Sequence, residues 1–237
     1  MAKKKHVPTP PKKSNNTLIY AGLAILVIAA LGFIIFNNNT TPETPGKVPT
    51  EGKFIKLNKP STYEPGKVKI VEFMKFGCGH CYALNQYMPE LKKKYGDKLE
   101  VIYKPMLWRS VPNDLASKKS IEAYIVANRT GKGEEMKDAL FKAVFVDKKD
   151  LSSQFVLIDI ARSVGLGDDF ATALEKGDAK DEAEANINLA ESFEVGFTPT
   201  LIINGNLKID PALTNEDTKL MNENLDKIIS SLLNQIR

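Results

Sequence analysis

The stretch VKIVEFMKFGCGHCYALNQYMPELKKKYG, residues 68–96, joins a strand pattern to a helix pattern through a pair of cysteines. Residues 68–76 are rich in β-branched and aromatic side chains, which is typical of a strand buried on both faces. The CGHC motif at residues 78–81 holds the only two cysteines of the 237-residue chain, and a helix should follow it directly. Pro89 should kink this helix, and Gly96 should end it.

Strand patterns lie on both sides of this stretch. Residues 53–57, KFIKL, alternate as a short edge strand, and residues 99–107, LEVIYKPML, predict a second buried strand. The two longer strands and the helix between them make a strand-helix-strand unit. Such a unit should have parallel strands and a right-handed connection.

The second half of the chain is predicted to be helical before it returns to the sheet. Apolar periodicity over residues 117–194 predicts about four or five helices. Residues 198–210 predict a hairpin that turns at Asn204-Gly205, and a last helix should begin at Thr214. This is the order of an α/β thioredoxin fold interrupted in its middle by helices.

The first 50 residues have a separate organisation. Residues 1–17 are a basic tail with no acidic residue, so the net charge of +4 reflects this tail and indicates no nucleic-acid-binding face. Residues 18–36 are uncharged and apolar, and as a helix they would measure about 28 Å, enough to cross a bilayer core. Residues 37–50, rich in Asn, Thr and Pro, should be a flexible linker to a domain at residues 51–237.

We expect residues 18–36 to be an uncleaved signal anchor. A buried core helix should have a polar stripe, which this run lacks. A cleaved signal peptide is the other alternative, since residues 30–32 offer a small-x-small site, but the apolar run is longer than usual for one. The lysines before the run place the N-terminus in the cytoplasm. The protein would then be a single-pass protein of the cytoplasmic membrane, with its domain in a periplasmic or extracellular compartment where disulfides persist.

The spacing of Cys78 and Cys81 favours redox chemistry. Cys78 should lie at a helix N-terminus, where the helix dipole stabilises a thiolate, and Cys81, one turn later, should resolve a mixed disulfide. A structural disulfide in so short a loop would remove little entropy from the unfolded chain, and a structural zinc site needs four ligands. A chance pair of buried thiols is the third alternative, and it does not explain the strand-to-helix position.

Three further residues are candidates for the site. His80 either stabilises the Cys78 thiolate by charge or hydrogen bonding, or is an exposed polar residue of the first helical turn. Glu72 is a carboxylate in an otherwise apolar strand, where burial should raise its pKa; a solvated edge position is the alternative. We hypothesise that it exchanges a proton with Cys81. Pro199 begins a strand pattern, either as a turn proline or with a cis peptide bond.

Three segments resemble the DsbA-type thiol-disulfide oxidoreductases of the thioredoxin superfamily: EGKFIKL from residue 51, VEFMKFGCGHCYAL at 71–84 and GFTPTLIING at 196–205. The resemblance covers the domain at 51–237, with a helical insertion at about 110–195, and it implies a thioredoxin fold. It also implies that Cys78 is the nucleophile, Cys81 the resolving thiol and Glu72 the buried acid. Lys104 does not clearly align with the buried lysine of the family.

The resemblance also describes the substrate side of the site. Pro199 looks like the cis-proline that packs against the disulfide, and the Thr198 backbone would pair with an extended substrate that also contacts Gly79. Two positions depart from the oxidants of the family. Gly79-His80 stands where Pro-His is frequent, and Thr198 stands where Val is common. Gly-His occurs in eukaryotic isomerases, and Thr occurs in isomerases and reductases.

The expected function is that of a membrane-tethered dithiol oxidase, which introduces disulfides into reduced, unfolded secreted proteins. The resemblance implies reoxidation by a quinone-linked membrane partner of the DsbB or VKOR type. An isomerase or reductase of the same fold is the alternative, and a non-enzymatic metal chaperone or peptide-holding module is a third hypothesis. We expect a monomer that uses no cofactor, no bound metal and no nucleic acid.

Overall fold

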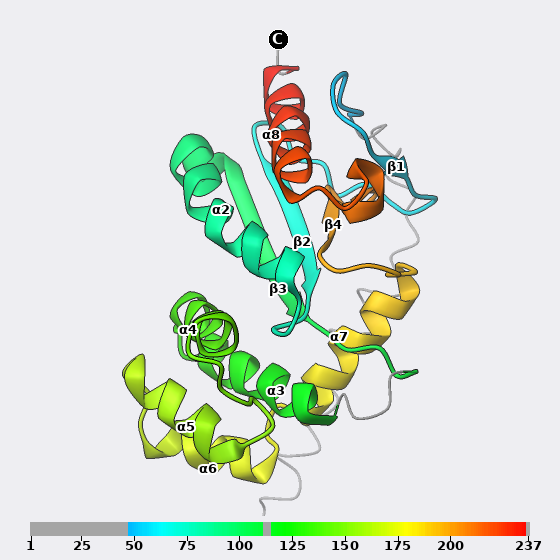
Figure 1. Ribbon diagram of the computed structural model, residues 1–237. Helices are drawn as coiled ribbons and strands as arrows, with labels where there is room; N and C mark the ends of the chain where they lie inside the picture. The colour runs from blue at the N-terminus through cyan, green and yellow to red at the C-terminus, as the bar shows by residue number, and fades with distance from the viewer. Residues whose placement is uncertain (1–46, 111–114, 236–237) are drawn as a thin grey trace, which may run out of the picture. The chain divides into compact units, whose positions relative to one another are not determined.

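The computed structural model describes residues 47–110 and 115–235, without the side chains of 115–117. These residues form a five-stranded sheet with helices packed on it and a further group of helices (Figure 1). The predicted basic tail, the predicted membrane span and residues 37–46 of the predicted linker lie outside the described residues. Within the described ranges, no helix combines the length and the apolar character that crossing a membrane requires.

The order of the elements is the interrupted order that the sequence predicts. The sheet has the strand order β1-β5-β4-β2-β3. Its strands are β1 (Ile55–Lys56), β2 (Val68–Met74), β3 (Leu99–Pro105), β4 (Thr200–Ile203) and β5 (Leu207–Ile209). The helices are α2 (Gly79–Tyr95), α3 (Leu115–Arg129), α4 (Gly133–Phe145), α5 (Gln154–Ser163), α6 (Asp168–Lys176), α7 (Lys180–Ser192) and α8 (Thr218–Asn234).

β2 lies between β3 and β4, and the cysteine motif follows its C-terminal end. It pairs in parallel with β3, as predicted, and antiparallel with β4. Glu72 of β2 therefore stands beside Tyr103 of β3 and Leu201 of β4. The prediction that β3 is buried is wrong in part, because β3 forms the edge of the sheet and Ile102 is 44% exposed. After β3 the chain continues into helices α3 to α7. No described strand pairs with the outer edge of β3.

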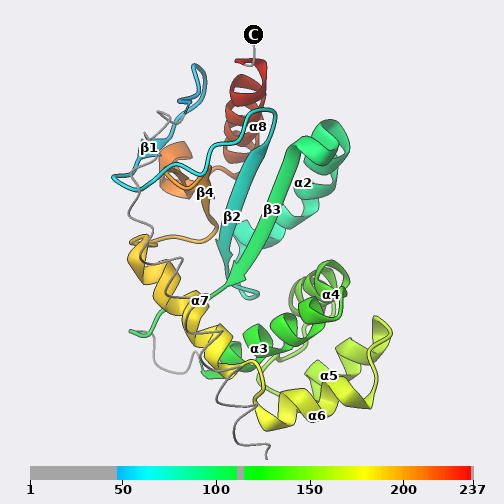
Figure 2. The ribbon, with the colours of Figure 1, turned by 180° about the vertical axis from the view of Figure 1, so that it is seen from behind.

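α2 and α8 pack on the same face of the sheet (Figures 1 and 2). α2 is one continuous helix on both sides of Pro89. It ends at Gly96, as predicted, where the φ of +54° favours glycine. The Tyr95 hydroxyl at this end donates to Asp226 Oδ1 of α8 at 2.6 Å. This contact fixes the C-terminal end of α2 against α8.

The N-cap of α8 lies three residues later than the sequence predicts. Thr214 does not open the helix but ends a separate 3₁₀ turn, and Asn215 after it has a positive φ of 52°. Asp217 is the N-cap of α8 and accepts the Leu220 N–H at 2.9 Å. Thr218 is therefore the first residue of the helix.

The insertion contains five helices, α3 to α7, in agreement with the periodicity (Figure 1). Aromatic side chains join α4 to the beginning of α2. Tyr82 stacks on Phe145 with ring centroids 4.6 Å apart, and Phe76 meets Phe141 edge to face at 5.3 Å. These contacts hold the first turn of α2 against the insertion.

The described part of the predicted linker packs on α8. The Thr50 N–H donates to Ser231 Oγ at 2.8 Å, and the Gln235 side chain donates to the Val48 carbonyl oxygen at 3.0 Å. The chain therefore enters the domain beside the C-terminal end of α8. This end is opposite to Thr218 along a helix about 25 Å long.

Candidate active site

The CGHC motif lies at the junction that the sequence predicts, between the end of β2 and the start of α2. Cys78 is the N-cap of α2, and its Sγ accepts the Cys81 N–H at 3.2 Å. The Cys78 thiol donates to the Thr198 carbonyl oxygen at 3.1 Å. Both cysteines are free thiols, and Cys81 is fully buried while Cys78 is partly exposed. Cys78 is therefore the thiol that a protein substrate can reach.

The surroundings of Cys78 stabilise its thiolate. A hydrogen bond with the Cys81 side chain is the largest cause that lowers the pKa of Cys78 to about 6, against the opposing effect of burial. Hydrogen bonds from the Thr198 side chain and the Cys81 N–H, and the charge of His80, also lower this pKa. The position at a helix N-terminus acts in the same direction. At neutral pH, Cys78 is mostly a thiolate.

Cys81 has the opposite character. Burial is the largest cause that raises the pKa of Cys81 well above its ordinary value. Its hydrogen bond with Cys78 and the charges of Cys78 and Glu72 raise the pKa further. In the reduced pair, the negative charge is thus on Cys78 and the proton on Cys81. Oxidation of the pair requires that this proton leave a buried sulfur.

The two residues between the cysteines differ in their contacts. His80 is half-buried, and its Nδ1 lies 3.1 Å from Thr218 Oγ1 of α8. Gly79 is exposed, and a Cβ at this position would meet no atom within 4 Å. Steric crowding therefore does not require glycine at residue 79. The space beside the Cys78 thiol is open at this position.

The Thr198–Pro199 peptide bond is cis, as the resemblance implied. Pro199 is buried directly before β4, and Thr198 is 7% exposed. The loop brings the Thr198 carbonyl oxygen to the sulfur of Cys78, although the two residues are 120 positions apart. The tertiary structure thus completes the environment of Cys78 with a distant loop.

We expect Thr198→Val to raise the pKa of Cys78 by about one unit. Valine has a similar shape but no hydroxyl, and a hydrogen bond to a charged group contributes about 1.5–3 kcal/mol, against 1.36 kcal/mol for each pKa unit. The measurement is the ultraviolet absorbance of the thiolate as a function of pH. Thr198→Ser retains the hydroxyl and should keep the midpoint. An unchanged midpoint in the valine variant would refute this role of the hydroxyl.

Glu72 is 2% exposed in the middle of β2, which confirms the predicted burial and excludes a solvated edge position. Burial is the largest cause that raises its pKa to about 8. The charge of Lys137 lowers this pKa, and the charges of Cys78 and Glu134 raise it. At neutral pH the Glu72 carboxyl is therefore mostly protonated. When it ionises at higher pH, its negative charge raises the pKa of Cys81.

A buried lysine lies near Glu72, and the sequence does not predict it. Lys137 of α4 is 2% exposed. Its Nζ lies 2.6 Å from Asn85 Oδ1, 3.0 Å from a Glu134 carboxylate oxygen and 4.2 Å from the centroid of the Tyr103 ring. Tyr103 is the neighbour of Glu72 in the β2–β3 register, so the insertion delivers a positive charge close to the buried acid.

No local pattern distinguishes Lys137 from a surface lysine. Its helix, α4, also carries Lys142, whose side chain is 63% exposed. Lys104, which the sequence analysis considered, is on β3 and only partly buried. The packing of α4 against α2 decides which lysine enters the interior.

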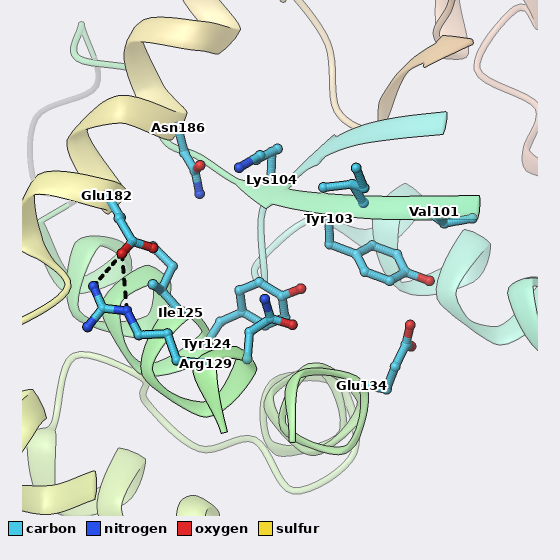
Figure 3. Close-up of a pocket in the computed structure, with 11 residues that line it drawn as sticks. Val101, Tyr103, Lys104, Tyr124, Ile125, Arg129, Glu134, Glu182 and Asn186 are labelled. Carbon is cyan, nitrogen blue, oxygen red and sulfur yellow. Dashed lines mark hydrogen bonds and ion pairs between the residues drawn. The ribbon is translucent and has the colours of Figure 1, made fainter. Parts of the chain in front are cut away.

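A pocket of about 220 Å³ lies between β3 and the helices α3, α4 and α7 (Figure 3). Tyr103 and Glu134 lie at one end, and the ion pair of Arg129 with Glu182 lies at the other. Lys104 also lines the pocket. The residues that line it do not include the CGHC motif, so the pocket is separate from the two thiols.

Comparison with known proteins identifies the family. A model of the DSBA-like thioredoxin domain matches residues 69–226, a range that includes the cysteine motif, the insertion and the cis-proline loop. The chain belongs to the DSBA-like thioredoxin family. The fold prediction of a thioredoxin domain with a helical insertion is thereby confirmed, and this DsbA-like protein is a thiol-disulfide oxidoreductase that uses the pair Cys78 and Cys81.

Characterised relatives cover most of the domain. The thiol:disulfide interchange protein DsbA of Burkholderia cepacia is 25% identical over 171 residues, which are 70% of this chain and 78% of that protein. DsbA of Pseudomonas aeruginosa is 24% identical over 164 residues, 68% of this chain and 75% of that protein. The crystal structure of Pseudomonas aeruginosa DsbA has a TM-score of 0.61 at 20% identity and covers 76% of this chain and 91% of its own. Reduced DsbA1 from Neisseria meningitidis has a TM-score of 0.59 at 22% identity, covering 81% and 98%.

Proposed function

We propose that this DsbA-like protein is an extracytoplasmic oxidase that introduces disulfides into reduced, unfolded secreted proteins. The stabilised Cys78 thiolate is the observation that supports the direction of exchange. Stabilising the thiolate favours the reduced form of the pair, so the Cys78–Cys81 disulfide accepts electrons readily. A low-pKa thiolate is also a good leaving group when the mixed disulfide is resolved.

The exchange takes place in two steps. A substrate thiolate attacks the sulfur of Cys78, the Cys78–Cys81 bond breaks, and the Cys81 sulfur leaves and takes up a proton from Glu72. A second substrate thiolate then attacks the substrate sulfur of the mixed disulfide, and Cys78 leaves as a thiolate. Two electrons pass from two substrate thiols to the cysteine pair, and the substrate gains one disulfide. The Thr198 backbone pairs with the extended substrate, and the open position at Gly79 leaves room for it.

The cell supplies the oxidant for the next cycle. A quinone-linked membrane protein of the DsbB or VKOR type would take the two electrons from reduced Cys78 and Cys81. The apolar run at residues 18–36 supports a membrane anchor with the N-terminus inside and the domain in the periplasm or outside the cell. Such an anchor would keep the domain near secreted substrates and near a membrane-bound reoxidant.

The direct test is oxidative refolding of a reduced disulfide protein by the full-length chain. The oxidised wild-type protein is expected to restore the activity of the substrate protein. One molecule of the oxidised protein should be reduced for each disulfide that forms in the substrate. Cys78→Ser should be inactive, because the remaining sulfur of Cys81 is buried. Refolding by this variant at the wild-type rate would contradict the proposal.

An isomerase or reductase is the second candidate function, and Gly79-His80 together with Thr198 favours it. The reduction potential of the cysteine pair against glutathione separates the candidates. An oxidase should have a potential near the value of about −120 mV that is typical of DsbA, whereas a potential near the thioredoxin value of about −270 mV would refute the oxidase proposal.

A further inference from the structure

His80 contacts a residue that is distant in the sequence. Its Nδ1 lies 3.1 Å from Thr218 Oγ1, across 138 positions of sequence. The two residues lie in the first turns of α2 and α8, so these two helices bring their N-terminal ends together beside the cysteine motif. Neither the motif nor the hairpin indicates this contact in the sequence.

We propose that Thr218 is a positioning residue, which holds the imidazole of His80 where its positive charge stabilises the Cys78 thiolate. The inference rests on Cys78 being the reactive thiolate of the proposed function. The threonine hydroxyl accepts a hydrogen bond from Nδ1 of the charged ring, and it can donate to Nδ1 of the neutral ring when the proton is on Nε2. In both cases the hydrogen bond fixes the ring orientation.

Thr218 is well placed for this role because it begins a helix that is capped and packed in the core. Asp217 caps the helix directly before it, and the buried face of α8 anchors the helix in the core. Ile228 and Ile229, on that face, have no exposed surface. His80, in contrast, is half-buried and follows the open position at Gly79. The hydrogen bond from Thr218 therefore limits the orientations that the His80 side chain can adopt.

Removal of the hydroxyl should weaken the Cys78 thiolate. In Thr218→Val the ring of His80 loses its hydrogen bond and can rotate toward solvent, which moves its charge away from the sulfur. We expect the ratio of thiolate to thiol at a fixed pH to fall about twofold to fivefold, the range that one modest hydrogen bond supports. Thiolate absorbance against pH and the rate of Cys78 alkylation measure this ratio. Thr218→Ser should retain the wild-type ratio.

A double-mutant cycle tests whether the effect passes through His80. In a His80→Ala background, Thr218→Val should cause no further change in the ratio. An equal effect in both backgrounds, an effect in Thr218→Ser, or no effect in Thr218→Val would overturn the proposal. Thr218→Ala replaces the valine variant if thermal unfolding shows that valine disrupts the first turn of α8.

Asn222→Ala is the matched control. Asn222 and Thr218 both line a pocket of about 450 Å³ between α2 and α8, and the contact described for the His80 ring is with Thr218. Its replacement should leave the Cys78 thiolate unchanged. The titration requires no oxidase activity, so it can fail while the refolding assay succeeds, and it can succeed while that assay fails.

Discussion

Replacing Cys81 with alanine is expected to abolish turnover and to leave the protein trapped in a mixed disulfide. The Cys78 thiolate of the variant still attacks the disulfide of an oxidised partner, and one partner sulfur leaves as a thiolate. The wild-type protein would then release the partner through attack by Cys81. Alanine is preferable to serine because a buried hydroxyl would need a hydrogen-bond partner in the position of the sulfur.

Electrophoresis without reductant, followed by mass spectrometry of the adduct, measures this trapping. The adduct should join Cys78 to one partner cysteine and should dissolve on addition of a reducing agent. Cys78→Ala is the matched control, and it should form little adduct, since the remaining Cys81 is buried and its pKa is raised. Equal trapping by both variants would show that the two thiols do not have separate roles.

The second large effect is expected for Glu72→Gln, which should make the folded protein more stable at alkaline pH. Burial raises the pKa of Glu72 to about 8, while the unfolded chain has an ordinary carboxyl. Between about pH 4.5 and 8 the unfolded state binds fewer protons than the folded state, so the free energy of unfolding falls as the pH rises and is level above pH 8. The upper bound of this loss is about 5 kcal/mol.

Glutamine retains the shape and cannot ionise, so the stability of the variant should not show this loss. Urea unfolding of the reduced proteins at several pH values measures the difference, which should be largest near pH 9 and vanish near pH 4. Lys137 keeps its partners in the variant, because Asn85 and Glu134 contact its Nζ. Parallel stability curves for the two proteins across this range would contradict the assigned burial effect.

The same variant tests the proposed proton exchange. If Glu72 gives a proton to Cys81, the rate of disulfide exchange in Glu72→Gln should lose its transition near pH 8. Lys137→Met is the control that retains the carboxyl, and it should move the transition to a higher pH because the charge of Lys137 lowers the pKa of Glu72. An unchanged pH profile in Glu72→Gln would exclude the exchange.

The elements with local sequence signals were predicted well. The β-branched run of β2, the helix after Cys78 and the end of α2 at Gly96 lie as expected. The hairpin turn was also predicted, because an Asn-Gly pair favours positive φ angles. Asn204 and Gly205 both adopt a positive φ in the structure. The errors concern the burial of one strand and the start of one helix, which depend on neighbouring segments. β3 is an edge strand, and α8 starts at Thr218.

By itself, the sequence determined the chemistry of the site, since Cys78 and Cys81 acquire their spacing and their place at a helix N-terminus from adjacent residues. It also placed Glu72 in an apolar strand. Only the tertiary structure decided what surrounds these groups. Lys137, Thr198 and Thr218 come from distant segments, and each acts over a few ångströms. Periodicity predicts which local face is apolar, but the pKa of a thiol or carboxyl depends on charges, donors and burial in space, which packing alone brings together.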